Sequence, residues 1–303
     1  MSSMQFAYYE KQGRTAKADL VWICKIFNLL SFLLLEESTE DGKKEISNSM
    51  IPTKELQQMR AFHKNAKLKK DIVSEILNHQ KQDQIIKGTY GQENGKWRGC
   101  AVGCSIHSLN IKCGKNIPTN DHTAYEKELG IPESLAKLED YLFENMPQEA
   151  AVKWPAEFMK AIPVGANLSL VAPRFIVGTL REVIKLKYVK DDKAVVKAVV
   201  VVAKLWEQVI AGKNVKEAAW SAAWLAAWSA AESAAESAAE SAAESAAWLA
   251  AWLAAWLAAW SAAESAAWSA AESAAESAAW SAAWSAASYK MSRRLLKIIR
   301  SCK

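Results

Sequence analysis

The sequence predicts a mainly α-helical protein, with a helical core followed by a long amphipathic repeat helix. Apolar residues recur at helical spacing through the middle of the chain. Helix breakers are scarce, since the 303 residues include only 12 Gly and 7 Pro. Composition divides the chain into an N-terminal extension at 1–50, a helical core at 51–213 and a repeat tail at 214–303, which lacks both Gly and Pro.

The N-terminal extension holds an apolar run at residues 20–35, followed by a polar linker. Lys25 and Asn28 lie inside the run, which is shorter than the roughly 20 apolar residues of a membrane-spanning helix. We therefore expect a buried or interface helix and no membrane partner. Three basic residues precede the run, so a signal anchor is the alternative.

Two helices are expected in the first part of the core. Leu68, Ile72 and Ile76 lie at helical spacing and predict one of them. Pro132 favours the start of the other, because proline is preferred at the beginning of a helix, and Pro147 ends it.

Glycine marks a different kind of segment. Residues 88–120 contain six Gly and break the helical pattern, so they predict a Gly/Cys-rich region of loop or short strand. Residues 191–211 are rich in Val, but their length favours a buried helix that ends at Gly212.

The tail is a tetrapeptide repeat, Ala-Ala-(Trp/Glu)-(Ser/Leu), from Ala218 to Ser285. Alanine is the best helix former, so the repeat predicts a helix of roughly 100 Å. At about 100° per residue, the Glu fall on one side and most of the Trp on the other. Leu295, Leu296 and Ile299 continue the Trp side. Expansion of a short DNA unit explains a repeat, but not this phasing.

A row of Trp side chains needs a partner, because large exposed apolar patches mark contacts. This Trp-lined helix therefore packs along the core, folds back on itself or packs against another chain. We predict a homo-oligomer formed through it.

Charge, cysteine content and missing motifs narrow the function classes. A net charge of +5 is too small to predict nucleic-acid binding. The five Cys do not form a disulfide framework, which favours a reducing, cytoplasmic location. The sequence has no P-loop, GxGxxG, GxSxG or HExxH pattern, so no cofactor is assigned and most common enzyme classes are disfavoured.

Cysteine and histidine gather at Cys100, Cys104, His107 and Cys113. Thiolates and imidazoles are zinc ligands, but this is not a standard zinc spacing, and no metal site is predicted. A nucleophile pair of Cys100 or Cys104 with His107 or His122 is an alternative. A third interpretation is that the cysteines pack as small buried apolar groups.

Glu139 is the unusual residue of the helix expected after Pro132. It lies at the edge of the apolar stripe, so it needs a partner or a raised pKa. The candidate partners are His107, His122, Arg98 and Arg174. Nearby, His122, Tyr125 and Glu126 are spaced to share one helix face, which predicts either a ligand-binding cluster or a solvated face.

Several segments, in this order, resemble a family of phage and mobile-element proteins. They are IIKGTYGQENGKWRGCAVGCSIH (85–107), HTAYEKELGIPESLAKLEDYLFENMP (122–147), WPAEFMKAIPVGANLSLV (154–171) and the Ala/Trp-rich tail. Asp140 and Glu144 are among the matching positions, and residues 1–50 lie outside the resemblance. The resemblance implies a phage accessory protein in the cytoplasm of a bacterial host, and it supplies no mechanism.

We therefore expect a protein that acts by binding, either sequestering a small anionic, nucleotide-like ligand or blocking a host defence factor. Basic side chains and the backbone N–H groups of a Gly-rich loop bind phosphate. The alternatives are a Cys/His/Glu-dependent enzyme and an assembly protein that uses the Trp-lined helix. The candidate ligand-binding residues are Lys96, Arg98, Gly99, Cys100, Gly103, Cys104, His107, His122, Tyr125, Glu126 and Glu139.

Overall fold

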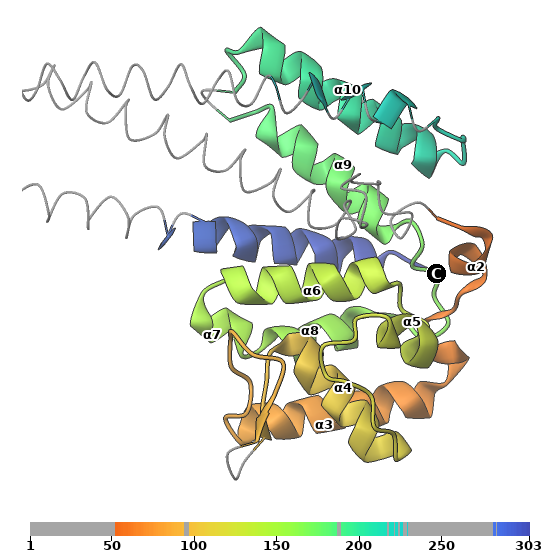
Figure 1. The fold of residues 1–303 in the computed structure, drawn as a ribbon, viewed down its shortest axis with the longest axis vertical. Helices are drawn as coiled ribbons and strands as arrows, with labels where there is room; N and C mark the ends of the chain where they lie inside the picture. The colour runs from red at the N-terminus through yellow and green to blue at the C-terminus, as the bar shows by residue number, and fades with distance from the viewer. Residues whose placement is uncertain are drawn as a thin grey trace, which may run out of the picture. The chain divides into compact units, whose positions relative to one another are not determined.

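The computed structural model confirms a mainly α-helical protein (Figure 1). It describes residues 52–93, 97–186, 189–216, isolated residues and short runs between 218 and 229, and residues 281–303 apart from Ala283. The elements are α2 (Lys54–Gln58), η2 (Ala61–Lys64), α3 (Ala66–Lys81), β1 (Gln92–Glu93), β2 (Trp97–Arg98), α4 (Ala101–Cys113), α5 (Ala124–Leu129), α6 (Glu133–Asn145), α7 (Gln148–Ala151), α8 (Trp154–Ala161), α9 (Val171–Val183) and α10 (Lys193–Ile210). A further helix runs through residues 284–300.

The described residues divide into two compact units. One unit holds the residues up to Thr179, together with Trp206–Asn214 and Ser285–Lys303. The other holds Leu180–Leu205 and the described residues from Val215 to Trp284. The first unit contains all the described side chains of the candidate site. The domain boundaries expected at 50 and 213 stay predictions.

The helix predicted from Leu68, Ile72 and Ile76 is α3. Ile72 and Ile76 are fully buried, and α3 packs against α4 and α8. The side chain of Asn65 accepts a hydrogen bond from the backbone N–H of Leu68 at 3.0 Å and so caps the start of the helix.

The predicted helix between Pro132 and Pro147 is α6, which packs against α4, α5 and α8. A residue outside the helix caps its N-terminus. The Glu126 carboxylate accepts a hydrogen bond from the backbone N–H of Glu133 at 2.9 Å. The helix expected before Gly212 is also present as α10.

The loop expected over residues 88–120 is wrong for residues 101–113, which form α4. Glycine serves packing rather than helix breaking at Gly103, where a Cβ atom would lie 2.2 Å from the Tyr90 carbonyl oxygen. A helix interior accepts glycine at a cost of about 1 kcal/mol, and here the missing side chain lets another backbone approach. Gly114, in the left-handed conformation, ends the helix.

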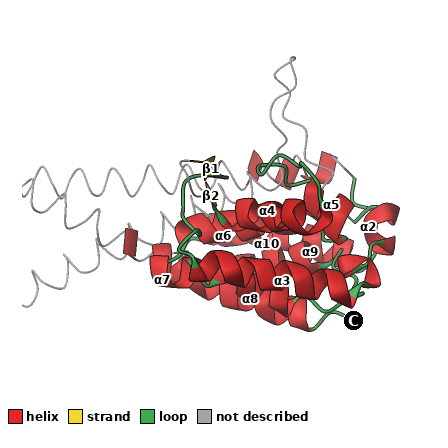
Figure 2. Cartoon of the chain, turned by 90° about the horizontal axis from the view of Figure 1, so that it is seen from below, coloured by secondary structure: helices red, strands yellow, loops and turns green. Residues whose placement is uncertain are grey.

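A short antiparallel hairpin, β1 and β2, lies beside α4 (Figure 2). Backbone hydrogen bonds join Ile86 to Gly99 at 2.9 Å and Cys100 to Thr89 at 2.7 Å. These bonds hold the chain around Tyr90 against the first turn of α4. The segments on either side of the hairpin therefore bring Tyr90 and Cys100 close together.

The body of the Trp-lined helix and the apolar run at 20–35 lie outside the described residues. The described residues of the tail from 281 to 300 are helical. Leu295, Leu296 and Ile299 are buried there, as the amphipathic pattern predicts. Arg293 pairs with Glu157 of α8. Among the described helices, none is both long and apolar enough to cross a bilayer.

Candidate functional site

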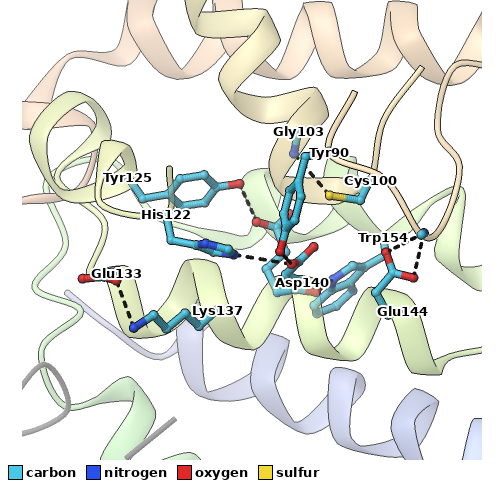
Figure 3. Close-up of polar contacts among 12 residues, drawn as sticks. Tyr90, Cys100, Gly103, His122, Tyr125, Glu133, Lys137, Asp140, Glu144 and Trp154 are labelled. Carbon is cyan, nitrogen blue, oxygen red and sulfur yellow. Dashed lines mark hydrogen bonds and ion pairs between the residues drawn. The ribbon is translucent and has the colours of Figure 1, made fainter. Parts of the chain in front are cut away.

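Polar side chains from several segments of the first unit come together inside the protein (Figure 3). Helix α6 supplies Glu139, Asp140 and Glu144. The segment before the hairpin supplies Tyr90, and Cys100 precedes the first turn of α4. The loop before α5 contributes His122, and α5 itself contributes Tyr125. We call the set Tyr90, Cys100, His122, Tyr125, Glu139, Asp140 and Glu144 the carboxylate cluster.

Asp140 is at the centre of the carboxylate cluster and is only 6% exposed. Its Oδ2 accepts a hydrogen bond from the Tyr90 hydroxyl at 2.9 Å and lies 3.4 Å from Nε2 of His122. Among the described residues, Oδ1 accepts no hydrogen bond of ordinary geometry. The neighbouring Cys100 thiol is a weak donor at best. A buried carboxylate oxygen without a hydrogen bond destabilises the folded protein unless another group, such as a bound ligand, interacts with it.

Glu139 is fully buried, and its partner is Tyr125 rather than any His or Arg. The Tyr125 hydroxyl donates a hydrogen bond to Oε2 at 2.7 Å. Burial raises the pKa of Glu139 well above its usual value, and the charge of Asp140 adds to the rise. The expected partners His107, His122, Arg98 and Arg174 are therefore wrong for this carboxyl. Tyr125 satisfies one of its two oxygens, because a phenol brings a donor without a second buried charge.

Glu144 is half-buried, one helical turn after Asp140. Both of its carboxylate oxygens lie near the backbone N–H of Gly88, at 3.1 and 3.0 Å. Burial raises the pKa of Glu144, whereas the Gly88 N–H and the charge of Lys87 act in the opposite direction. Glu144 is thus fixed in place by the segment that leads into the hairpin.

Cys100 completes the cluster as the N-cap residue of α4. Its sulfur accepts a hydrogen bond from the backbone N–H of Gly103 at 3.4 Å. Burial raises the pKa of this thiol, and the charge of Asp140 raises it further. Cys100 Sγ, an oxygen of Asp140 and an oxygen of Glu144 all lie within 4.8 Å of one another.

The second buried thiol, Cys104, donates a weak hydrogen bond to the Gly99 carbonyl at 3.4 Å. Burial raises its pKa as well. Because the thiolate is the nucleophilic form, both cysteines are poorly suited to attack a substrate. These observations favour the interpretation of Cys100 and Cys104 as buried groups over a Cys–His nucleophile.

His107 and Glu126 have other contacts. His107 stacks on Trp97 at 4.1 Å and lies 5.3 Å from His79, centroid to centroid. Glu126 caps the start of α6. The expected common helix face of His122, Tyr125 and Glu126 is wrong for His122, because α5 begins only at Ala124.

The remaining described candidates lie in β2, directly after it, or in α4. Arg98 is exposed on β2, and Gly99 is buried, where a Cβ atom would come within 2.8 Å of the Trp97 ring. Gly103 admits the Tyr90 backbone. Lys96 lies outside the described residues. The structure therefore brings together Cys100, His122, Tyr125 and Glu139 from the predicted set.

Sequence reasoning missed Tyr90, Asp140 and Glu144 as site residues. Asp140 and Glu144 are four residues apart on α6 and share a helix face, which was available as a signal. The segment before the hairpin covers that face, through Gly88 and Tyr90. No known protein family, characterised protein or solved structure matches this chain.

Proposed function

We propose that this chain is a binding protein whose ligand presents positive charge or hydrogen-bond donors to the carboxylate cluster. The observation that carries the proposal is Asp140 Oδ1, a buried carboxylate oxygen without an ordinary hydrogen bond among the described residues. Oε1 of Glu139 is in the same condition. Buried polar atoms in native proteins nearly always have partners, so a bound group is a natural way to supply them.

The charge of the site supports the choice of ligand. Asp140 and Glu144 lie one turn apart on α6, and the imidazole of His122 is 3.4 Å from Asp140. A cation gains from this arrangement, whereas a phosphate is repelled by it. The nucleotide-like anion expected near Lys96 and Arg98 draws no support from the cluster and stays a prediction. The accessory role and the blocking of a host defence factor stay predictions too.

Binding is better supported than catalysis by the Cys/His/Glu set. Burial raises the pKa of both thiols, which disfavours an unassisted thiolate nucleophile. One oxygen of Glu139 already accepts a hydrogen bond from the Tyr125 hydroxyl. The assembly role of the Trp-lined helix concerns residues outside the described part of the chain, and homo-oligomer formation stays a prediction.

Native mass spectrometry of the full chain purified from cells tests this proposal. We expect extra mass on the wild-type protein that disappears on denaturation, and loss of that mass in Asp140→Asn, which removes the charge but keeps the shape. Asp83→Asn, at an exposed position, is the matched control and retains the mass. A wild-type protein without added mass, and without a thermal shift in any cationic ligand, contradicts the proposal.

A further inference from the structure

The cluster contains three donor atoms of the kinds that bind transition metals. They are Sγ of Cys100 and one oxygen each of Asp140 and Glu144, all within 4.8 Å of one another. Zinc binds sulfur at about 2.3 Å and carboxylate oxygen at about 2.0–2.2 Å, so ligands around one ion lie within about 4 Å of each other. Binding of one ion by all three atoms therefore requires small side-chain rotations.

We propose that Cys100, Asp140 and Glu144 together bind a zinc-class divalent metal ion. The inference rests on the proposed function, since it names the class of cation that the carboxylate cluster receives. It differs from the spacing-based possibility of Cys100 with Cys104, His107 and Cys113. Cys104 instead donates to the Gly99 carbonyl, and Cys113 is exposed.

A second observation points to a missing partner at the same place. Asp140 is more than nine-tenths buried, and its Oδ1 accepts no ordinary hydrogen bond within the described part of the chain. In Figure 3 this carboxylate lies between Tyr90, Cys100 and Glu144. A metal ion supplies the positive charge that such a buried oxygen needs.

Each proposed ligand is already oriented by a donor behind it. The Gly103 N–H donates to Cys100 Sγ, the Tyr90 hydroxyl to Asp140 Oδ2 and the Gly88 N–H to Glu144. Such second-layer hydrogen bonds fix the ligands of established metal sites and tune their affinity. Three separate hydrogen-bond donors therefore orient the three proposed ligands.

The donor types select the class of metal. Calcium prefers six to eight oxygen ligands, and magnesium prefers an octahedron of oxygens, whereas a thiolate favours zinc and related softer ions. On coordination the Cys100 thiol releases its proton to water and the sulfur binds as thiolate. Three protein ligands leave a fourth position for water or for His122, the imidazole beside Asp140.

Metal binding by the full chain, stripped of metal with a chelator, tests the inference. We expect one equivalent of zinc per chain in competition with a chromophoric chelator, and a thiolate-to-cobalt charge-transfer band with Co²⁺. Cys100→Ser keeps an N-cap oxygen, so α4 is preserved, but it removes the band and weakens zinc binding more than about 100-fold. Cys113→Ser, at an exposed thiol, leaves both signals unchanged.

Further variants keep the test decisive. If Cys100→Ser fails to fold by circular dichroism, Glu144→Gln, at the half-buried ligand, gives the answer through the same zinc titration. A band that survives Cys100→Ser, or zinc binding that survives Glu144→Gln, overturns the metal site. A native adduct that depends on Asp140, shows an organic mass and survives Cys100→Ser overturns the metal site while the proposed function stands. Absence of any adduct and of any metal binding overturns both.

Discussion

The hydroxyl of Tyr125 and the carboxyl of Glu139 are both fully buried and form a 2.7 Å hydrogen bond between α5 and α6. The bond joins two helices that meet at a sharp turn through Gly130 and Pro132. It gives one buried carboxyl a partner without burying a second charge. Glu139 therefore has a structural role in the cluster, next to Asp140 in the sequence of α6.

Tyr125→Phe tests the strength of this bond. The ring stays in place, but one oxygen of Glu139 loses its donor inside the protein, which costs about 1–3 kcal/mol. We expect the free energy of unfolding in urea to fall by that amount. Tyr289→Phe, on a partly exposed ring, serves as the control and changes stability by less than about 0.5 kcal/mol. Equal effects of the two substitutions would show that the buried bond contributes nothing.

Gly103→Ala tests the close contact between α4 and the hairpin. The new Cβ atom would lie 2.2 Å from the Tyr90 carbonyl oxygen, so the backbone must move. We expect a loss of about 1–3 kcal/mol in the free energy of unfolding, as is typical of overpacking. Because Tyr90 donates to Asp140, the same change displaces a side chain of the carboxylate cluster.

The matched control for this change is Gly178→Ala in α9. There the new Cβ atom meets only the flexible side chain of Arg294, at 3.3 Å. Alanine favours the helix over glycine by about 0.5–1 kcal/mol, so we expect no loss of stability or a small gain. Chemical denaturation of both variants, side by side, separates packing from helix propensity. A neutral Gly103→Ala would contradict the packing shown by the structure.

Much of the fold follows from local sequence, because the relevant forces are local. The apolar spacing of α3 and the prolines around α6 act within a few turns, and both helices were predictable. The buried face of residues 284–300 was predictable for the same reason. Helix α4 was not, because Gly103 breaks the pattern for a reason that lies 13 positions away at Tyr90.

The candidate site was only half predictable. Glu139 stood out because a carboxylate at the edge of an apolar stripe is costly. Asp140 did not stand out, because a charged residue on the opposite face of a helix usually lies in water. Its burial depends on the segment around Gly88 and Tyr90 lying against α6, and that long-range contact leaves no mark in the local spacing.

His79 makes the stability of the folded protein depend on pH, and replacing this residue separates its effect from that of the carboxylates. It is 3% exposed, and burial, followed by the nearby His107, lowers its pKa from 6.5 to about 4, against the opposing charge of Glu75. The folded state therefore holds a neutral imidazole that the unfolded state protonates below pH 6.5. Its contribution to stability is present above pH 6.5 and is lost as the pH falls toward 4.

Urea unfolding at pH 7 and at pH 4.5 measures this effect. The wild-type protein should lose stability between the two values by more than His79→Leu does, because the variant has no imidazole to protonate. His63→Gln, at an exposed histidine, should behave as wild type. An identical pH dependence in His79→Leu and wild type would mean that the imidazole is solvated in the folded protein.

The end of the chain contributes to the core of the first unit, and Leu295→Ala tests this. Leu295 is fully buried, so its truncation should cost about 2–5 kcal/mol, the sum of lost burial and a cavity. Lys297→Ala, exposed on the same helix, changes helix propensity little and should leave stability within about 0.5 kcal/mol of wild type. Thermal and urea unfolding of the full-length variants provide the comparison. Since the amphipathic repeat continues into this segment, a large loss for Leu295→Ala and none for Lys297→Ala would show that its apolar face packs as a true helix face. Equal, small effects would mean that residues 284–300 are only loosely attached to the unit.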